Sequence, residues 1–454
     1  MRTLVVLLLA SPISALDNGF PRPAMGFNPW NCFGVGRNGR FKFNVSWAHR
    51  FNDSVMRSVA DAMVSTGLAA AGYEYVSLDC GWTTGYRDHA TGEQIVNASR
   101  FPHGMKALGD YIHGKGLKYG IYTSASLQQC CSKIYSDSTD GSLDHEAVDA
   151  AAYASFGVDY LKFDGCDPVQ RSYPAMRDAL NATGRPILLS VNGYDMAEVD
   201  RVGEFANSWR TTGDDDDSLL GSLAPRIFAN DVYAHLARPG QFNDPDMLEV
   251  GNLAVLGNVT DARAHFSLWC AAKAPLIIGT DVTNMSAAAL AILTNDEAIA
   301  VNQDPLGLQA FVVWRSEAHL PPVGATLPPV PLESVWAGPL EGGAFAAVLF
   351  NAGEAAATIT LTRAMLLNST RHADVEADAD ADAEVDGGAR ARSPAWLLSR
   401  QKSYEMRDIW ARRSLGAFSD SYVATVEPHD VLFLRLSPVA SEPSARRSVE
   451  SARR

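Results

Sequence analysis

The sequence predicts an α/β fold in which a (β/α)8 TIM barrel is followed by a C-terminal antiparallel β-sandwich domain. Three observations support this prediction. Short apolar runs alternate with helix-like segments eight times between about residue 20 and residue 305. The helix-like stretches 54–72 and 145–157 each end in glycine before the next apolar run. Beyond about residue 306, short alternating strands follow one another without intervening helices.

The strand candidates of the barrel are short apolar segments spaced along the first two thirds of the chain. They span residues 24–30, 73–79, 117–123, 158–164, 186–191, 204–209, 240–247 and 274–280. Eight parallel strands close a (β/α)8 barrel, which we expect over residues 16–306. The alternative is an open doubly wound sheet, but no glycine-rich phosphate-binding loop follows the first strand.

The β-sandwich is predicted over residues 307–438, from strand candidates at 334–340, 343–353, 356–362, 403–410 and 429–437. An Ala/Asp/Glu-rich stretch at about residues 371–393 interrupts it. We expect this insertion and the tail at 439–454 to be disordered, because they contain too little apolar surface to bury.

The N-terminus has the pattern of a signal peptide over residues 1–15. Arg2 precedes an apolar run that is too short to span a bilayer, and small residues lead to a cleavage site after Ala15. N-glycosylation sequons occur at Asn44, Asn52, Asn97, Asn181, Asn258, Asn284 and Asn368. We therefore expect a glycoprotein of the secretory pathway, located extracellularly or in a lysosome or vacuole, with no membrane span.

Composition and charge narrow the class of ligand. The 454 residues are 47% hydrophobic and 20% charged, which is ordinary for a globular protein with one large and one smaller domain. The net charge of −14 disfavours a nucleic-acid partner, because phosphate contacts require clustered Lys and Arg. A neutral or cationic ligand is expected instead.

Carboxylates occur where the predicted strands end. Asp79, Asp164 and Asp214 follow three strands, and Asp244 and Asp246 follow a fourth. A single aspartate at such a position is more often a helix N-cap than a catalyst. Carboxylates at the ends of four strands are harder to explain by capping alone. Barrel enzymes carry their catalytic residues at the carboxyl ends of the strands, which is where these carboxylates are expected.

Two of these aspartates are predicted to differ in protonation. Lys162 precedes Asp164 by two residues on the same side of the strand and is expected to lower the pKa of Asp164. Asp214 begins a run of four aspartates, whose repulsion is expected to favour its protonated form. An ionised nucleophile facing a protonated acid is the arrangement of retaining glycosidases. Trp30 and Trp82, near the ends of the first two strands, are expected to stack on a sugar.

Five motifs carry a resemblance to a known family. In chain order they are YLKFDGC, SWRTTGD, NDPDML, AAKAPLIIG and NQDPLG. They resemble glycoside hydrolase family 27, the α-galactosidase (melibiase) family, over roughly residues 23–310, and VWAGPL and RDIW extend the likeness more weakly into the sandwich. The resemblance implies a secreted, retaining exo-glycosidase that hydrolyses terminal α-linked galactose, with no cofactor or metal ion.

The same resemblance implies roles for individual residues. Asp164 would be the nucleophile that forms a covalent glycosyl–enzyme intermediate, and Asp214 would be the acid/base. The remaining matches are substrate-binding positions or positions of the pocket wall, namely Trp30, Asp79, Tyr122, Lys162, Asn192, Arg210 and Asp246.

Cysteine pairings are also suggested by the resemblance. Cys166 resembles a half-cystine that pairs after strand three, where Cys130 has the best spacing and Cys131 is left without an obvious partner. Cys80 is expected to form a disulfide with Cys32, which follows strand one. Cys270 lies in an apolar helical stretch and is interpreted as a core residue.

The chain departs from the family pattern at two places. The strand-two motif is often Asp-Asp-Cys-Trp in the family, whereas here Cys80 follows Asp79, so one sugar-binding carboxylate is absent. After strand five, galactose-specific members typically have Cys-Glu-Trp beside the sugar 2-hydroxyl, whereas this chain has Asn192 and Gly193. An α-N-acetylgalactosaminidase or a β-L-arabinopyranosidase of the same family therefore remains an alternative.

Two other classes of function are alternatives. A metal-dependent hydrolase would use the aspartates at 214–217 with Asp244 and Asp246, but the run lacks the spacing of a calcium loop and no histidine cluster accompanies it. A non-catalytic sugar-binding protein is disfavoured because both candidate catalytic carboxylates are present. The expected partner is a carbohydrate with terminal galactose, and a homodimer is one expected assembly.

Overall fold

The computed structural model describes residues 18–33, 52–132, 137–166, 173–193, 196–214, 218–252, 256–320, 327–371, 401 and 403–439. The predicted signal peptide, the sequon at Asn44 and the aspartates at 215–217 lie outside these residues. The predicted acidic insertion also lies outside them except for Arg371, and so does the predicted tail except for Val439.

Eight parallel strands form the barrel predicted from the sequence. In spatial order they are β10 (Leu276–Ile278), β1 (Met25–Phe27), β2 (Tyr75–Ser77), β5 (Lys118–Ser124), β6 (Tyr160–Asp164), β7 (Leu188–Val191), β8 (Ser208–Arg210) and β9 (Phe242–Asp244). A parallel bridge between Leu248 and Ile278 joins the segment after β9 to β10 and closes the ring. Six of the eight strands lie within the predicted segments, and β5 and β8 each extend one residue beyond theirs, to Ser124 and Arg210, so the barrel prediction is confirmed.

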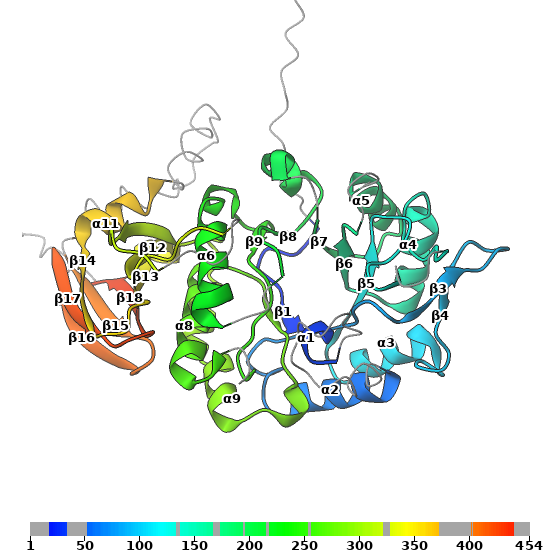
Figure 1. Cartoon of the computed structure of the whole chain (residues 1–454), viewed down its shortest axis with the longest axis horizontal. Helices are drawn as coiled ribbons and strands as arrows, with labels where there is room; N and C mark the ends of the chain where they lie inside the picture. The colour runs from blue at the N-terminus through cyan, green and yellow to red at the C-terminus, as the bar shows by residue number, and fades with distance from the viewer. Residues whose placement is uncertain are drawn as a thin grey trace, which may run out of the picture.

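Helices connect the strands and surround them (Figure 1). The α-helices of this part of the chain are α1 (Trp30–Phe33), α2 (Asp53–Ser65), α3 (Gly104–Gly114), α4 (Glu146–Phe156), α5 (Tyr173–Ala182), α6 (Ala224–Asp231), α8 (Val259–Ala271), α9 (Ala287–Leu293) and α10 (Asp296–Asn302). Shorter or tighter helical segments are η3 (Met196–Glu204), η4 (Leu219–Leu223), η5 (Ala234–Leu236) and η6 (Val282–Asn284).

Local sequence explains where several helices begin and end. Asn52 and Asn258 accept hydrogen bonds from the first turns of α2 and α8 and act as N-caps. Helix α4 ends at Gly157, whose φ of 84° is in the left-handed region that glycine tolerates.

A hairpin that the sequence did not predict follows β2. It consists of β3 (Thr83–Arg87) and β4 (Gln94–Val96). The last residue of β3, Arg87, is buried and forms a salt bridge of 2.6 Å with Asp149 of α4. This buried ion pair anchors the hairpin to the barrel's helical layer.

The C-terminal domain contains two antiparallel sheets around a separate core. One sheet has the order β11 (Phe311–Arg315), β12 (Glu333–Leu340), β13 (Ala344–Asn351), β18 (Val431–Pro438), β15 (Tyr404–Asp408) and β16 (Arg413–Phe418), and the other pairs β14 (Ala357–Thr362) with β17 (Ser421–Val426). The turn η7 (Glu341–Gly343) and the helix α11 (Arg363–Asn368) complete the domain. Strands β11, β16 and β17 were not predicted, whereas the other five were.

Helix α8 lies between the barrel and the sandwich (Figure 1). Nine of its thirteen residues are buried, which matches a helix covered on both sides. Polar contacts add to this interface, because Arg407 pairs with Glu297 and Trp410 donates to Ser267 of α8. Within the described residues, no helix is both long and apolar enough to cross a membrane.

Candidate active site

All nine predicted site residues line a single cavity of about 260 Å³ at the carboxyl ends of the barrel strands. They come from α1, from the strands β5, β6 and β8, and from the segments that follow β2, β7, β8 and β9. The residues are Trp30, Asp79, Tyr122, Lys162, Asp164, Asn192, Arg210, Asp214 and Asp246. The cavity suits one sugar ring with its hydroxyl groups facing polar side chains.

A larger cavity of about 430 Å³ lies beside the N-terminal segment of the described chain, next to Tyr75 and the Glu74–Lys118 ion pair. Lys118 begins β5, so this cavity is at the amino ends of the strands. Barrel enzymes carry their chemistry at the opposite end, where the nine residues lie. We therefore assign the candidate site to the smaller cavity.

Asp79 and Lys162 form the floor of the site. The Lys162 ammonium donates to Asp79 Oδ2 at 2.8 Å, and Asn28 donates to the same oxygen at 2.8 Å. The backbone N–H of Cys80 donates to Oδ1 at 2.7 Å. Burial alone would lower the pKa of Lys162, but the charges of Asp79 and Asp164 raise it above the ordinary value, so Lys162 is a cation.

Asp164 occupies the end of β6, where its two oxygens have different partners. The Tyr122 hydroxyl donates to Oδ2 at 2.8 Å, and the Gly165 N–H donates to Oδ1 at 2.9 Å. Burial raises the pKa of Asp164 above its usual value, although Lys162 and Tyr122 act in the opposite direction. Lys162 therefore acts in the predicted direction, but desolvation outweighs the lysine's charge and the net shift of this pKa is upward.

The pKa of Asp214 is lowered, whereas the sequence predicted that its protonated form would be favoured. Its side chain is 68% exposed and contacts Arg210 at 3.3 Å. Desolvation raises its pKa, but the charges of Arg210, Lys162 and Arg226 and the hydrogen bond from Arg210 outweigh that effect and lower it. The predicted protonation by crowded carboxylates is wrong, because cations surround the carboxylate.

Arg210 also forms an ion pair with another acidic residue of the cavity, Asp246. The two side chains form a buried salt bridge of 2.8 Å. Asp246 has a φ of 107°, a strained conformation for a residue other than glycine. Its backbone is held on both sides, since its N–H donates to Asp244 Oδ1 at 2.9 Å and its carbonyl accepts from Trp269 Nε1 at 2.8 Å. Asp244 itself does not line the cavity.

Two disulfides join three neighbouring strand ends through one loop. Cys130 pairs with Cys166, two residues after Asp164, as the family resemblance implied. Cys131 pairs with Cys80, directly after Asp79. The assignment of Cys80 to Cys32 is wrong, because Cys32 is free and Cys131, which had been left without a partner, lies within reach of Cys80.

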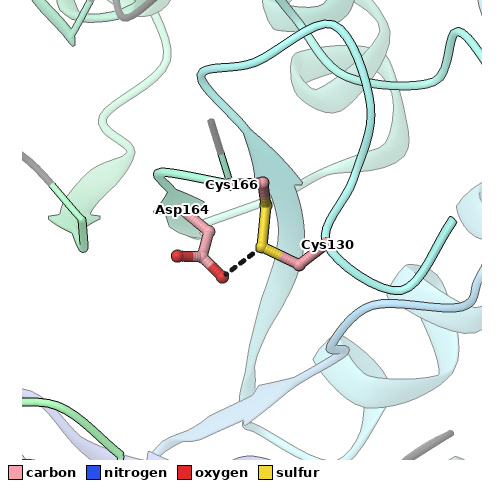
Figure 2. A group of neighbouring side chains, drawn as sticks. All are labelled: Cys130, Asp164 and Cys166. Atoms are coloured by element: carbon pink, nitrogen blue, oxygen red, sulfur yellow. Dashed lines mark hydrogen bonds between the residues drawn. A yellow bond between two sulfur atoms is a disulfide. The ribbon is translucent and has the colours of Figure 1, made fainter. Parts of the chain in front are cut away.

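Figure 2 shows Asp164 directed at the Cys130–Cys166 disulfide. The Cys130 sulfur lies 3.3 Å from Asp164 Oδ2. A disulfide sulfur carries no proton, so this approach is a packing contact and not a hydrogen bond. Although these three groups are close enough to hold a metal ion, both sulfurs are bonded to each other and neither is a thiolate ligand.

The two tryptophans expected to contact a sugar differ in position. Trp30 is half-buried and lines the cavity at the start of α1. Trp82 is 1% exposed, and its indole N–H donates to the carbonyl of Tyr122 at 2.8 Å. The expectation for Trp82 is therefore wrong: it is a core residue that supports β5 from behind.

The sequence analysis missed several residues of the cavity wall. Asn31, Cys130, Gly165 and Met247 line it, and Asn28 supports Asp79 from just behind. Asn31 and Met247 are direct neighbours of predicted site residues, so adjacency was a usable signal. Asn28 could have been found as the polar residue that ends the first strand segment.

The wall after β7 is formed by Asn192 and by two glycines in close contact. A Cβ added to Gly193 would lie 2.6 Å from the carbonyl oxygen of Gly165, and one added to Gly165 would lie 2.6 Å from that of Gly193. Gly193 also has a φ of 72°, which L-residues rarely adopt. The fold therefore excludes any side chain at position 193 and leaves Asn192 as the polar group of this wall.

This arrangement can perform nucleophilic displacement at the anomeric carbon of a sugar. Asp164 is a half-buried carboxylate with one oxygen bound by Tyr122, Asp214 is an exposed carboxylate in the same cavity, and the remaining polar groups can bind hydroxyls.

Comparison with known proteins agrees with this geometry. Residues 22–304 match the family model described as alpha galactosidase A, and residues 333–436 match the alpha galactosidase C-terminal beta sandwich domain. An α-galactosidase of Oryza sativa subsp. japonica is 40% identical over 93% of this chain and 87% of its own length. An α-N-acetylgalactosaminidase of Rattus norvegicus is 35% identical over 70% of this chain and 77% of its own length.

A solved structure has the same fold. The α-galactosidase I of Mortierella vinacea superposes with a TM-score of 0.73 at 30% identity, and the match covers 94% of this chain and all of that one. The family model alone spans more than half of the chain, and the relatives span most of it. The chain belongs to the α-galactosidase (melibiase) family, glycoside hydrolase family 27.

Proposed function

We propose that the protein, a glycoside hydrolase of the α-galactosidase class, releases terminal α-linked galactose by a retaining mechanism with Asp164 as nucleophile and Asp214 as acid/base. The observation that carries the proposal is the convergence of Asp164, Asp214, Lys162, Arg210 and Asp246 on one small cavity. A cavity that accommodates one ring favours exo-action on oligosaccharides or glycoconjugates.

The first half of the reaction would form a covalent intermediate. An oxygen of Asp164 attacks the anomeric carbon, the bond to the glycosidic oxygen breaks, and the proton of Asp214 passes to that oxygen. Each oxygen of Asp164 accepts one hydrogen bond, Oδ2 from the Tyr122 hydroxyl and Oδ1 from the Gly165 N–H, and these bonds would orient the carboxylate for attack. In the second half, Asp214 takes a proton from water as the water displaces Asp164.

Asp214 must acquire a proton before the first half-reaction. Asp214 is paired with Arg210 at 3.3 Å, and the same guanidinium nitrogen binds Asp246 at 2.8 Å. A bound sugar that covers Asp214 would exclude water and raise its pKa toward that of a general acid. We therefore assign proton uptake by Asp214 to the binding step.

The sugar would be held by groups whose charge is already fixed. Asp79 and Lys162 are paired at 2.8 Å and present a carboxylate and an ammonium to neighbouring hydroxyls. Arg210 and Asp246 present the same combination from the other side of the cavity. Trp30 supplies an aromatic surface for the apolar face of the ring.

The test is hydrolysis of a nitrophenyl α-galactoside by the wild type and by Asp164→Asn. We expect the substitution to lower kcat/KM by about a thousandfold or more, because the amide cannot form the intermediate. Wild-type rates in the variant would refute the assignment of the nucleophile.

A second candidate, an α-N-acetylgalactosaminidase or a β-L-arabinopyranosidase, is favoured by two features of the wall. The contact between Gly165 and Gly193 excludes a side chain at position 193 of the wall after β7. At the other side, Cys80 is buried in a disulfide where the family often has a second carboxylate. Rates on the nitrophenyl glycosides of α-galactose, α-N-acetylgalactosamine and β-L-arabinopyranose would decide between them, and a higher kcat/KM on either alternative would displace galactose.

We further propose delivery through the secretory pathway to an extracellular, lysosomal or vacuolar location. This rests on the leader at residues 1–15 and on the density of sequons. A homodimer stays a prediction, which the mass of the purified protein by light scattering would check.

A further inference from the structure

Asn31, the second residue of α1, has one polar end that no described residue binds. The residue is 6% exposed and lines the cavity. Its Nδ2 donates to Glu249 Oε1. Among the described residues no group donates to its Oδ1, and this oxygen is not one of the enclosed polar atoms that lack a partner. Since the cavity is the open space that Asn31 borders, Oδ1 is left to face it.

Asn28, three residues earlier, has the opposite arrangement. Its Oδ1 accepts from the backbone N–H of Trp30 at 2.9 Å, and its Nδ2 donates to Asp79 at 2.8 Å. Both ends of that amide are therefore satisfied within the protein. A nearly buried amide oxygen without a donor costs free energy, so Asn31 Oδ1 needs a partner from outside the chain.

Glu249 determines which end of the Asn31 amide faces the cavity. It is 2% exposed, and Asn252 donates to its Oε2 at 2.6 Å, so each of its oxygens accepts one amide N–H. A carboxylate accepts hydrogen bonds and donates none. The Asn31 amide must therefore turn its nitrogen toward Glu249 and its oxygen away from it.

The packing around this hydrogen bond leaves the amide little room to rotate. A Cβ added to Gly279, just after β10, would lie 3.1 Å from Glu249 Oε1 and 3.2 Å from Asn31 Nδ2. The backbone N–H of Glu249 donates to His265 Nε2 of α8 at 3.0 Å. The position of Asn31 Oδ1 is thus fixed before a ligand arrives, which lowers the entropic cost of binding.

The chemistry of this oxygen differs from that of the charged groups in the same wall. Lys162 is paired with Asp79, and Arg210 is paired with Asp246. Asn31 Oδ1 is a neutral acceptor, which binds a donor without the desolvation of a charge. It therefore fits the O–H of a neutral ligand.

We propose that Asn31 Oδ1 accepts a hydrogen bond from one hydroxyl group of the terminal sugar, and that Glu249 is the positioning residue that keeps this oxygen turned into the cavity. The sugar position that meets Asn31 must then carry a donor, so fluorine is rejected there. This inference rests on the proposed function, since it concerns the same sugar. Because the bond is made to a hydroxyl and not to a reacting atom, its loss should raise KM and leave kcat near that of the wild type.

The experiment uses galactose and its 2-, 3-, 4- and 6-deoxyfluoro derivatives as inhibitors of nitrophenyl α-galactoside hydrolysis. Fluorine is close to a hydroxyl in size but donates no hydrogen bond. In the wild type, fluorine at the position that meets Asn31 should weaken inhibition about fivefold. In Asn31→Ala that fluorine effect should disappear, while the effects at the other positions stay as in the wild type. The assays are run at pH 8, because burial raises the pKa of Glu249 to about 7.

Three further variants separate this role from a general loss of structure. Asn252→Ala is the matched control, because it removes the other donor to Glu249 but does not alter a residue of the cavity wall, and it should keep all fluorine effects. Glu249→Met accepts no hydrogen bond and should lose the fluorine effect at the position that meets Asn31. Glu249→Gln has a carbonyl oxygen that can accept from Asn31 and should restore this effect.

Each outcome decides the proposal. If Asn31→Ala retains every fluorine effect of the wild type, the contact with the sugar is refuted, and if Glu249→Met retains them, the positioning role is refuted. Fluorine effects that change in Asn252→Ala would also overturn the proposal, because the wall would then respond to any disturbance of Glu249. If Glu249→Met does not fold, the comparison of Asn31→Ala with Asn252→Ala gives the decision. A wild type that neither binds galactose nor hydrolyses the galactoside contradicts the proposed function, whereas one that does both without a fluorine effect dependent on Asn31 contradicts this inference alone.

Discussion

At the scale of single residues, the two candidate catalytic carboxylates are set apart by their surroundings. Asp164 is half-buried between Tyr122 and a disulfide, and desolvation raises its pKa. Asp214 is exposed beside Arg210, and its pKa is lowered. In the free enzyme Asp164 thus titrates at a higher pH than Asp214. The loss of activity at low pH is therefore expected to follow protonation of the nucleophile, Asp164.

The pH dependence of kcat/KM follows from this order. Activity of the free enzyme should fall as the pH drops through the raised pKa of Asp164, because a protonated carboxyl cannot attack the anomeric carbon. The measurement is kcat/KM for an aryl α-galactoside from pH 3 to pH 8. Since Tyr122 stabilises the carboxylate through its hydroxyl, Tyr122→Phe should move the acid limb to higher pH. A limb that moves to lower pH would contradict the assignment.

The same raised pKa has a consequence for stability. A carboxyl whose pKa is higher in the folded than in the unfolded protein contributes stability that is present below the unfolded value and is lost as the pH rises through the folded value. The ionised Asp164 therefore costs folding free energy at neutral pH.

The role of Asp214 as the general acid can be tested with substrates that differ in their leaving group. Asp214→Asn should lower kcat/KM by about a hundredfold or more on oligosaccharides, whose leaving oxygen needs a proton, and by much less on a dinitrophenyl α-galactoside. Steady-state rates on the two substrates give the comparison. A uniform loss on both would indicate that Asp214 only binds the sugar.

At the scale of elements, the site depends on close contacts between strand ends. The backbones of Gly165 after β6 and Gly193 after β7 approach so closely that neither tolerates a side chain. The Cys130–Cys166 and Cys80–Cys131 disulfides fix the ends of β6 and β2 to the loop after β5. The carboxylates Asp79 and Asp164 are carried by the two strand ends that these disulfides hold.

Gly193→Ala should destabilise the protein by about 2 kcal/mol or more, because the new Cβ meets backbone atoms and the positive φ is strained. Thermal unfolding measures the change, and activity should fall with it because Asn192 is displaced. The control is Gly114→Ala at the end of α3, where a Cβ meets nothing within 4 Å. Equal stability of the two variants would contradict the close contact between the backbones of Gly165 and Gly193.

The disulfide that was not predicted gives another test. The paired variant Cys80→Ala/Cys131→Ala opens a loop of 51 residues, and loop entropy sets the stability loss at about 4 kcal/mol. Denaturant unfolding of the variant and the wild type under non-reducing conditions measures it. Because Asp79 follows β2 directly before Cys80, KM for the galactoside should rise as well. An unchanged KM would show that the disulfide supports only the fold.

Strand periodicity and motifs were enough to predict the eight barrel strands and the nine cavity residues, because both are local in sequence. The partner of Cys80 lies 51 residues away, and spacing does not determine which cysteines meet. The charge of Lys162 lowers the pKa of Asp164 as predicted, but the burial that outweighs it arises only from the folded chain. The contacts with Arg210 that lower the pKa of Asp214, against the prediction, also arise only from the folded chain. The burial of Trp82 depends in the same way on β5 packing against it.

At the scale of the whole molecule, the sandwich completes the barrel's hydrophobic core. Helix α8 is covered on one side by barrel strands and on the other by sandwich strands, and it carries His265 and Trp269, which support Glu249 and Asp246. The domain interface also contains the ion pair between Arg263 and Asp430. Helix α8 is therefore one buried connection between the sandwich and the sugar site.

The central claim is that Asp164 forms a covalent bond to the sugar. Its most direct test is peptide mass spectrometry of the enzyme after incubation with a fluorinated α-galactoside that forms the intermediate quickly and releases it slowly. The account predicts the added mass of one fluorinated glycosyl group on the peptide that contains Asp164, and none in Asp164→Asn. A sugar attached to another carboxylate, or hydrolysis without any adduct and with inversion at the anomeric carbon, would contradict it.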